Sequence, residues 1–170
     1  MRTSTRAVFL VCLWTAIGAS CASAAEPDCE PVLAAQIAQS QADRYSVKTS
    51  MSGRAGTEAG EIMKTPEGMF VKRDGRWAKS PVQLTQKDRA DLIEYGRKNI
   101  SNCKLFGKET RDGKAMAIYT YNQKAPNLPT SDIKLWIGTA DGLPHKLEVS
   151  TGDKNVTQTI DYSAAIKAPK

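Results

Sequence analysis

The C-terminal part of the chain alternates apolar and polar residues with a period of two. The alternation runs through residues 132–140, 143–151 and 156–162. Such a period places successive side chains on opposite faces of a β-strand. Asp141-Gly142 and the segment 152–155 lie between these runs and have the residue types of tight turns. The pattern therefore predicts three consecutive antiparallel strands with one apolar face and one polar face.

Two other segments repeat their apolar residues every three to four positions, which is typical of an amphipathic helix. Residues 31–43 begin with Pro31, which suits the first helical turn, and residues 88–100 follow a Thr85–Asp88 pattern that resembles a capping box. Each segment is predicted to be a helix. The expected buried stripes are Leu33, Ala34, Ile37 and Ala38 in the first helix, with glutamines opposite, and Leu92, Ile93, Gly96 and Ile100 in the second.

Shorter alternating runs at 45–51, 60–65, 69–73, 76–80, 103–110 and 114–122 predict further strands joined by tight turns. The glycine-rich segment 52–60 is expected to be a mobile link. No helix joins successive strands in the C-terminal half, which disfavours a parallel sheet. The predicted fold class is α+β: a curved antiparallel sheet, an unclosed barrel of about seven to eight strands, with two α-helices on its concave face.

The first 25 residues have the features of a signal peptide. A basic opening without acids precedes an apolar run, and the run ends in the small residues Ala22-Ser23-Ala24-Ala25. We expect cleavage after Ala24 or Ala25 and a single domain over residues 26–170. Lipidation of Cys21 is the alternative, although the residues before it lack the leucine usual in such a site. The mature chain has no apolar run long enough for a transmembrane span, so we expect a periplasmic or secreted protein.

Charge and cysteine content are consistent with export. The net charge of +6 falls to about +4 when the signal peptide, with Arg2 and Arg6, is removed. Basic residues are more frequent between Lys64 and Arg111 than elsewhere. A solvated face explains them better than nucleic-acid binding does. Cys29 and Cys103 are the cysteines left in the mature chain. In an oxidising compartment they are expected to form a disulfide, which contributes roughly 4 kcal/mol for a long loop.

The sequence carries none of the common catalytic or nucleotide-binding motifs. It has no Gly-x-Ser-x-Gly, P-loop, dinucleotide fingerprint or His-Glu-x-x-His pattern. His145 is the only histidine, and its place on the apolar alternation indicates a satisfied core or cavity-edge residue. A hydrolase using His145 would need a cleft beside it and a serine or aspartate in reach. We therefore expect no enzyme, no catalytic residue, no cofactor and no metal.

The segment from Lys134 to Val149, followed by Thr157–Tyr162, resembles the LolA/LolB-like group of periplasmic lipoprotein-carrier and lipid-binding proteins. The shared pattern is a strand with a Trp, a turn, Gly-Leu-Pro, a strand of basic and apolar residues, and a Thr-rich strand that ends in Tyr. The rest of the chain matches by element order alone. The resemblance implies an unclosed barrel whose helices cover an apolar cavity for acyl chains. The chain is shorter than such carriers, and their cavity arginine does not align with a particular residue, so no functional residue is carried over from the resemblance.

The sequence thus predicts an exported binding protein that holds a lipid or another hydrophobic small molecule against the concave sheet face. The expected lining comprises Ile133, Leu135, Ile137, Leu147, Val149 and Ile160. The alternative is an interaction or scaffold module of the cell envelope, with a fully packed core, no ligand and a protein partner. Its function would depend on exposed features such as Trp77, Trp136 and the basic middle segment. Neither hypothesis involves nucleic acid.

Overall fold

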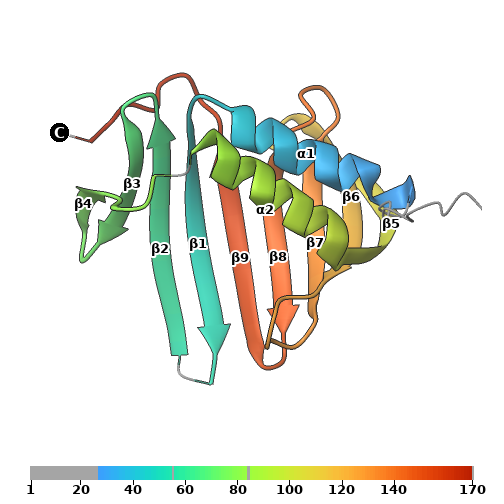
Figure 1. Cartoon of the computed structure of the whole chain (residues 1–170). Coiled ribbons are helices and arrows are strands. Elements are labelled where there is room, and N and C mark those ends of the chain that lie inside the picture. Colours follow the sequence, from blue (N-terminus) through green and yellow to red (C-terminus); the bar gives the residue numbers. More distant parts are fainter. Residues whose placement is uncertain (1–26, 55, 84, 170) are drawn as a thin grey trace, which may run out of the picture.

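The computed structural model describes residues 27–54, 56–83 and 85–169, and it contains one curved antiparallel sheet with two α-helices on one face (Figure 1). The predicted signal peptide and Cys21 lie outside the described residues. The elements are a short 3-10 helix Pro27–Cys29, α1 Glu30–Gln41, β1 Tyr45–Gly53, β2 Gly56–Thr65, β3 Gly68–Arg73, β4 Arg76–Lys79, α2 Gln86–Asn99, β5 Ile100–Arg111, β6 Lys114–Gln123, β7 Ser131–Gly138, β8 Pro144–Thr151 and β9 Lys154–Asp161.

The sheet has nine strands in the order β4-β3-β2-β1-β9-β8-β7-β6-β5, and every neighbouring pair is antiparallel. The α+β class is confirmed, but the expected seven to eight strands were too few. The short strands β3 and β4, which were predicted at 69–73 and 76–80, pair in the same ladder at one edge and so count toward the sheet. At the centre of the sheet β1 pairs with β9, and this pairing joins the N-terminal strands to the C-terminal strands.

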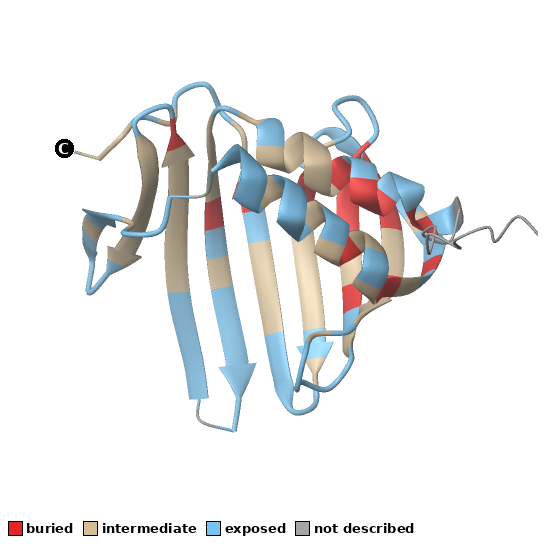
Figure 2. Cartoon of the chain, in the orientation of Figure 1, coloured by how far each residue is buried: buried red, intermediate tan, exposed pale blue. Residues whose placement is uncertain are grey.

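The prediction that residues 52–60 form a mobile link was wrong for most of these residues. β1 continues to Gly53 and β2 begins at Gly56, and the two are opposite each other in the ladder. Gly56 has a φ of 113°, a conformation that favours glycine at such a turn. Both strands project beyond the helices here, where their ends are exposed (Figure 2). Backbone pairing therefore orders this segment although its side chains bury little surface.

The two helices lie side by side across one face of the sheet, which we call the concave face (Figure 1). The predicted capping box of α2 is confirmed: the Asp88 amide donates to Thr85 Oγ1 at 3.2 Å, and the Thr85 amide donates to the Asp88 carboxylate at 2.8 Å. Hydrogen bonds from Thr85 lower the pKa of Asp88. Gly96 lets the helices approach, since a Cβ there would lie 3.3 Å from Gln36 Oε1.

The predicted disulfide between Cys29 and Cys103 is present and joins the start of α1 to β5. It fixes the rotation of α1, whose buried residues are Val32, Leu33 and Ala35. The predicted stripe was therefore partly wrong, because Ala34 is exposed. In α2, Gly96 is the buried residue, whereas Leu92 of the predicted stripe is 55% exposed. The main core lies between α1 and strands β5 to β7.

A second apolar cluster lies on the opposite, convex face and contains Met116, Ile118 and Trp136. The indole nitrogen of Trp136 donates to Glu109 Oε1 at 2.8 Å. The ammonium groups of Lys134 and Lys146 lie 4.9 and 4.4 Å from its rings. Trp136 is consequently buried, which contradicts its predicted exposure under the scaffold hypothesis. Among the described residues, no helix is both long and apolar enough to cross a membrane.

Candidate functional site

The six residues predicted to line a cavity lie on three adjacent strands. Ile133 and Leu135 of β7 are directly opposite Val149 and Leu147 of β8, and Ile160 of β9 completes the group. Alternation along each strand turns these side chains toward the helices. The β7 residues and Ile160 are buried, and the two β8 residues are half-buried.

Five of the six predicted residues line a cleft of about 200 Å³ beneath α1, which we call the inner cleft. Ile137 is the exception: it does not line the cleft, and it is opposite Pro144 in the ladder. The inner cleft is lined by Gln36, Gln39, Tyr121, Gln123, Ser131, Ile133, Leu135, Pro144, Leu147, Val149, Gln158 and Ile160. Its floor is therefore mostly apolar, and its helical side carries amides.

Gln36 and Gln39 are functional candidates that the sequence reasoning missed. The predicted stripe placed the glutamines of α1 away from the sheet, but both line the inner cleft and are half-buried. The amide of Gln36 donates to the hydroxyl of Tyr121 at 3.5 Å. Burial of Tyr121 raises its pKa to about 12, against a smaller opposing effect of this hydrogen bond. Polar groups are thus built into the interface between helix and sheet.

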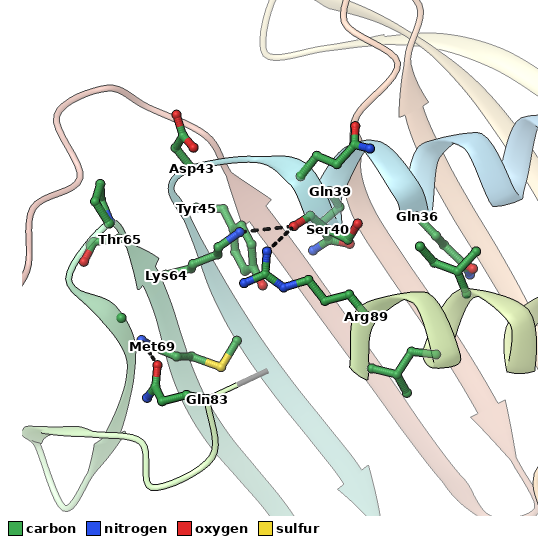
Figure 3. Close-up of a pocket in the computed structure, with 15 residues that line it drawn as sticks. Gln36, Gln39, Ser40, Asp43, Tyr45, Lys64, Thr65, Met69, Gln83 and Arg89 are labelled. Atoms are coloured by element: carbon green, nitrogen blue, oxygen red, sulfur yellow. Dashed lines mark hydrogen bonds between the residues drawn. The ribbon is translucent and has the colours of Figure 1, made fainter. Parts of the chain in front are cut away.

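A larger cleft of about 590 Å³, the outer cleft, opens between the two helices and strands β1 to β3 (Figure 3). Gln36 and Gln39 line this cleft as well, so the two clefts adjoin along α1. Its residues are Gln36, Gln39, Ser40, Gln41, Asp43, Tyr45, Lys64, Thr65, Pro66, Gly68, Met69, Gln83, Arg89, Leu92 and Ile93. Apolar side chains from α2 and the sheet share the wall of this cleft with two cations, whereas α1 contributes polar side chains.

The two cations of the outer cleft converge on the C-terminal end of α1. Lys64 Nζ donates to the carbonyl oxygens of Ser40, at 3.2 Å, and Ala42, and Arg89 Nη1 donates to the same Ser40 oxygen at 3.3 Å (Figure 3). The last carbonyls of a helix lack partners within it and carry partial negative charge. Burial, and then repulsion by Arg89, lower the pKa of Lys64, while Asp43 raises it by a smaller amount. The cleft is therefore a cationic environment.

Tyr45 forms the aromatic part of this environment. Its ring lies 5.7 Å from Lys64 Nζ and 6.1 Å from the ring of Tyr162. Burial raises the pKa of Tyr45, against a lowering effect of Arg89, so the phenol remains neutral at pH 7. Tyr45 consequently adds no negative charge that would compete with the two cations.

His145 is a buried residue with a hydrogen-bond partner, as its place on the apolar alternation predicted. It is buried, its Nε2 lies 2.9 Å from Asp141 Oδ2, and its ring stands edge-on to Tyr162. Asp141 also accepts a hydrogen bond from the Leu143 amide, which closes the turn between β7 and β8. Burial raises the pKa of Asp141, but hydrogen bonds from Leu143 and His145 outweigh it, so the net shift is downward. The pair fixes a turn next to the inner cleft.

Comparison with solved structures finds proteins of similar architecture. LprF from Mycobacterium bovis has a TM-score of 0.56 at 14% identity, and the match covers 86% of this chain and 98% of LprF. The lipoprotein LppX from Mycobacterium tuberculosis has a TM-score of 0.53 at 12% identity, with 82% and 98% covered. A LolA superfamily protein from Nitrosomonas europaea is more distant, with a TM-score of 0.29, 9% identity and coverage of 75% and 91%.

The chain shares its fold with LprF and LppX, and its architecture resembles that of LolA/LolB-like proteins. The predicted resemblance is thereby confirmed at the level of fold, which is what identities of this size show. No protein-family model matches the sequence, and no curated protein matches it. A LolA/LolB-like fold is compatible with many ligands, so function has to be argued from the two clefts.

Proposed function

We propose that this chain is an exported, non-enzymatic binding protein that holds a lipid or another amphiphile between its helices and the concave face. The observation that carries the proposal is the inner cleft, where five apolar residues from three strands lie beneath α1 and adjoin a larger cleft. A scaffold with a fully packed core would have neither cleft. The outer cleft, at about 590 Å³, lies within the range of roughly 300–1,000 Å³ that is usual for small-molecule sites.

Affinity in this proposal comes from apolar surface removed from water, at about 25 cal/mol per Å². Leu147 and Val149 are half-buried without a ligand and would become buried against a hydrocarbon chain. The strand ends that extend beyond the helices add further apolar surface, including Met51, which is 42% exposed. The ligand would therefore enter along the open side of the sheet.

Export is part of the proposal. It is supported by the predicted signal peptide and by the Cys29–Cys103 disulfide, since such bonds persist in oxidising compartments. The fold neighbour LppX is described as a lipoprotein, which agrees with a function in the cell envelope. The first measurement is native mass spectrometry of the mature protein from its own periplasm, followed by organic extraction of any bound species.

The decisive test compares two leucine-to-aspartate variants. Leu147→Asp places a charge in the inner cleft, whereas Leu128→Asp places the same charge on a loop residue that is 63% exposed. We expect the first variant to lose uptake of a fluorescent fatty acid and the second to retain it, with both folded by circular dichroism. If Leu147→Asp fails to fold, Leu147→Trp serves instead, because a larger apolar side chain fills the cleft without a charge. Undiminished uptake by a folded Leu147 variant would contradict the proposal.

A further inference from the structure

We propose that the outer cleft binds an oxyanion headgroup, a carboxylate or a phosphate, whose hydrocarbon chain extends into the inner cleft. This inference rests on the proposed function and makes it specific: the cargo would be an anionic amphiphile. Neither the fold nor an apolar cavity requires such a headgroup. The inference comes from the charges on the wall of the outer cleft and from the way in which the two clefts adjoin.

The charge balance of the outer cleft favours an anion. Lys64 and Arg89 come from β2 and α2, yet both reach the carbonyl of Ser40. The end of a helix carries only about half a negative charge, so it offsets part of two full positive charges. Asp43 is the carboxylate on this wall, and it is exposed, so water weakens its effect. Lys64 is half-buried, and an oxyanion beside it would relieve the repulsion between the two cations.

The cleft also offers donors suited to an oxyanion. Lys64 has an ammonium with three protons, two of which donate to the Ser40 and Ala42 carbonyls, and Arg89 has a planar guanidinium, a group that binds carboxylate and phosphate well. The side-chain amide of Gln83 lies on the same wall, where its oxygen accepts from the Met69 amide at 3.3 Å and its nitrogen donates to the Ser80 carbonyl at 2.7 Å, so one amide proton is left for a ligand. A carbonyl that already holds two cations in place preorganises them, which reduces the entropy lost on binding.

The positions of Gln36 and Gln39 indicate how the ligand would be oriented. These amides line both clefts, so they mark the boundary between the cationic wall and the apolar floor. Neutral amides suit the ester or glycerol part of an amphiphile, which needs hydrogen bonds and no charge. The headgroup would lie toward β1 to β3, and the chain would lie over β7 to β9 beneath α1.

The test compares ligands with one chain and different headgroups. Palmitic acid, palmitoyl-lysophosphatidylglycerol and monopalmitoylglycerol are titrated into the mature protein by calorimetry, together with inorganic phosphate. Hydrogen bonds to charged groups contribute more than neutral ones, so we expect both anionic ligands to bind at least about tenfold more tightly than monopalmitoylglycerol. Inorganic phosphate alone should bind far more weakly, because it lacks the chain.

Variants separate charge from structure. Lys64→Gln keeps hydrogen-bond donors for the α1 carbonyls but removes one of the two positive charges, and it should weaken the anionic preference while monopalmitoylglycerol binds as before. Lys64→Arg should retain the preference. Lys48→Gln is the matched control, since Lys48 is exposed on the neighbouring strand and follows the alternation onto the convex face. Thermal melting verifies that each variant is folded.

Three outcomes would overturn the inference. Equal affinity for monopalmitoylglycerol and palmitic acid would remove the headgroup site and leave the proposed function intact. Tight binding of inorganic phosphate alone would mean a free oxyanion site with no amphiphile. Failure of all three palmitoyl ligands to bind the folded protein would reject the proposed function itself, and the headgroup site with it.

Discussion

The amide of Gln36 on α1 donates to the hydroxyl of Tyr121 on β6, across the interface between helix and sheet. This contact lies where the inner cleft meets the main core, so it holds α1 at a defined height above the strands. The floor of the cleft is thus apolar, and a polar contact fixes part of its roof. We therefore expect the stability of the fold to depend on pH, on the disulfide and on the turn that follows β7.

Tyr121 should make the fold sensitive to alkali. Its pKa of about 12 exceeds the ordinary value of 10.0, so the folded state favours the protonated phenol. Stability from this residue is therefore present below pH 10 and is lost as pH rises from 10 toward 12. Two pKa units correspond to about 2.7 kcal/mol as an upper bound. Denaturant unfolding should show a smaller loss over this range for Tyr121→Phe than for the natural protein.

The same comparison at pH 7 provides the control. There Tyr121→Phe removes only a long hydrogen bond, so its cost should stay below about 1.5 kcal/mol. Burial also raises the pKa of Tyr45 and Tyr162. Both proteins therefore lose the stability that these two residues contribute as the pH rises. Parallel stability curves for the two proteins above pH 10 would show that Tyr121 ionises as freely in the folded state as in the unfolded state.

Period-two patterns predicted the strands well because one buried face constrains every second residue. Ile133, Leu135 and Leu147 were placed correctly for this reason. The β1–β2 hairpin end was missed because backbone pairing alone orders it. The depth and shape of a cleft depend on how far the helices stand from the sheet, and no local pattern encodes that distance.

The helix face was harder to predict, because α1 is rich in alanine and several stripes fit it equally well. The structure selects the stripe that starts at Cys29 and continues through Val32, Leu33 and Gln36, with helical spacing throughout. Extending the pattern back to the disulfide-forming cysteine would have revealed that Gln36 faces the sheet. No sequence pattern predicted that Lys64 and Arg89 share the outer cleft, because only the fold brings β2 and α2 together there.

Removal of the disulfide should loosen α1 selectively. Cys29 precedes the helix directly and is buried against β5, so Cys29→Ala with Cys103→Ala should cost about 2–5 kcal/mol in unfolding free energy. Hydrogen exchange should accelerate more over residues 30–41 than over β7 and β8. Because α1 roofs the inner cleft, uptake of a fluorescent fatty acid should weaken under reducing conditions. Uniform acceleration across the sheet would show that the bond stabilises the whole fold and not the helix.

Gly138 should not tolerate a side chain. A Cβ there would lie 2.2 Å from Asp141 Oδ1 and 3.0 Å from His145 Nε2, so the carboxylate would have to move away from the Leu143 amide and His145. Gly138→Ala should cost about 1–3 kcal/mol by overpacking and lost hydrogen bonds. Gly60→Ala is the matched control: Gly60 is also in a strand, and nothing lies within 4 Å of its added Cβ. Equal melting temperatures of the two variants would contradict this account of the turn.

Trp136 offers an internal reference for ligand binding, because it lies on the face opposite the clefts. Trp14 belongs to the predicted signal peptide, so in the mature Trp77→Phe variant the fluorescence comes from Trp136. Its emission should be blue-shifted and poorly quenched by acrylamide, since its side chain is buried under Lys134 and Lys146. Lys146→Ala should shift the emission to the red, because it uncovers the ring. Addition of a fatty acid should leave the emission unchanged in either protein if the ligand occupies the concave face, whereas a large change would place the ligand on the convex face and contradict both cleft assignments.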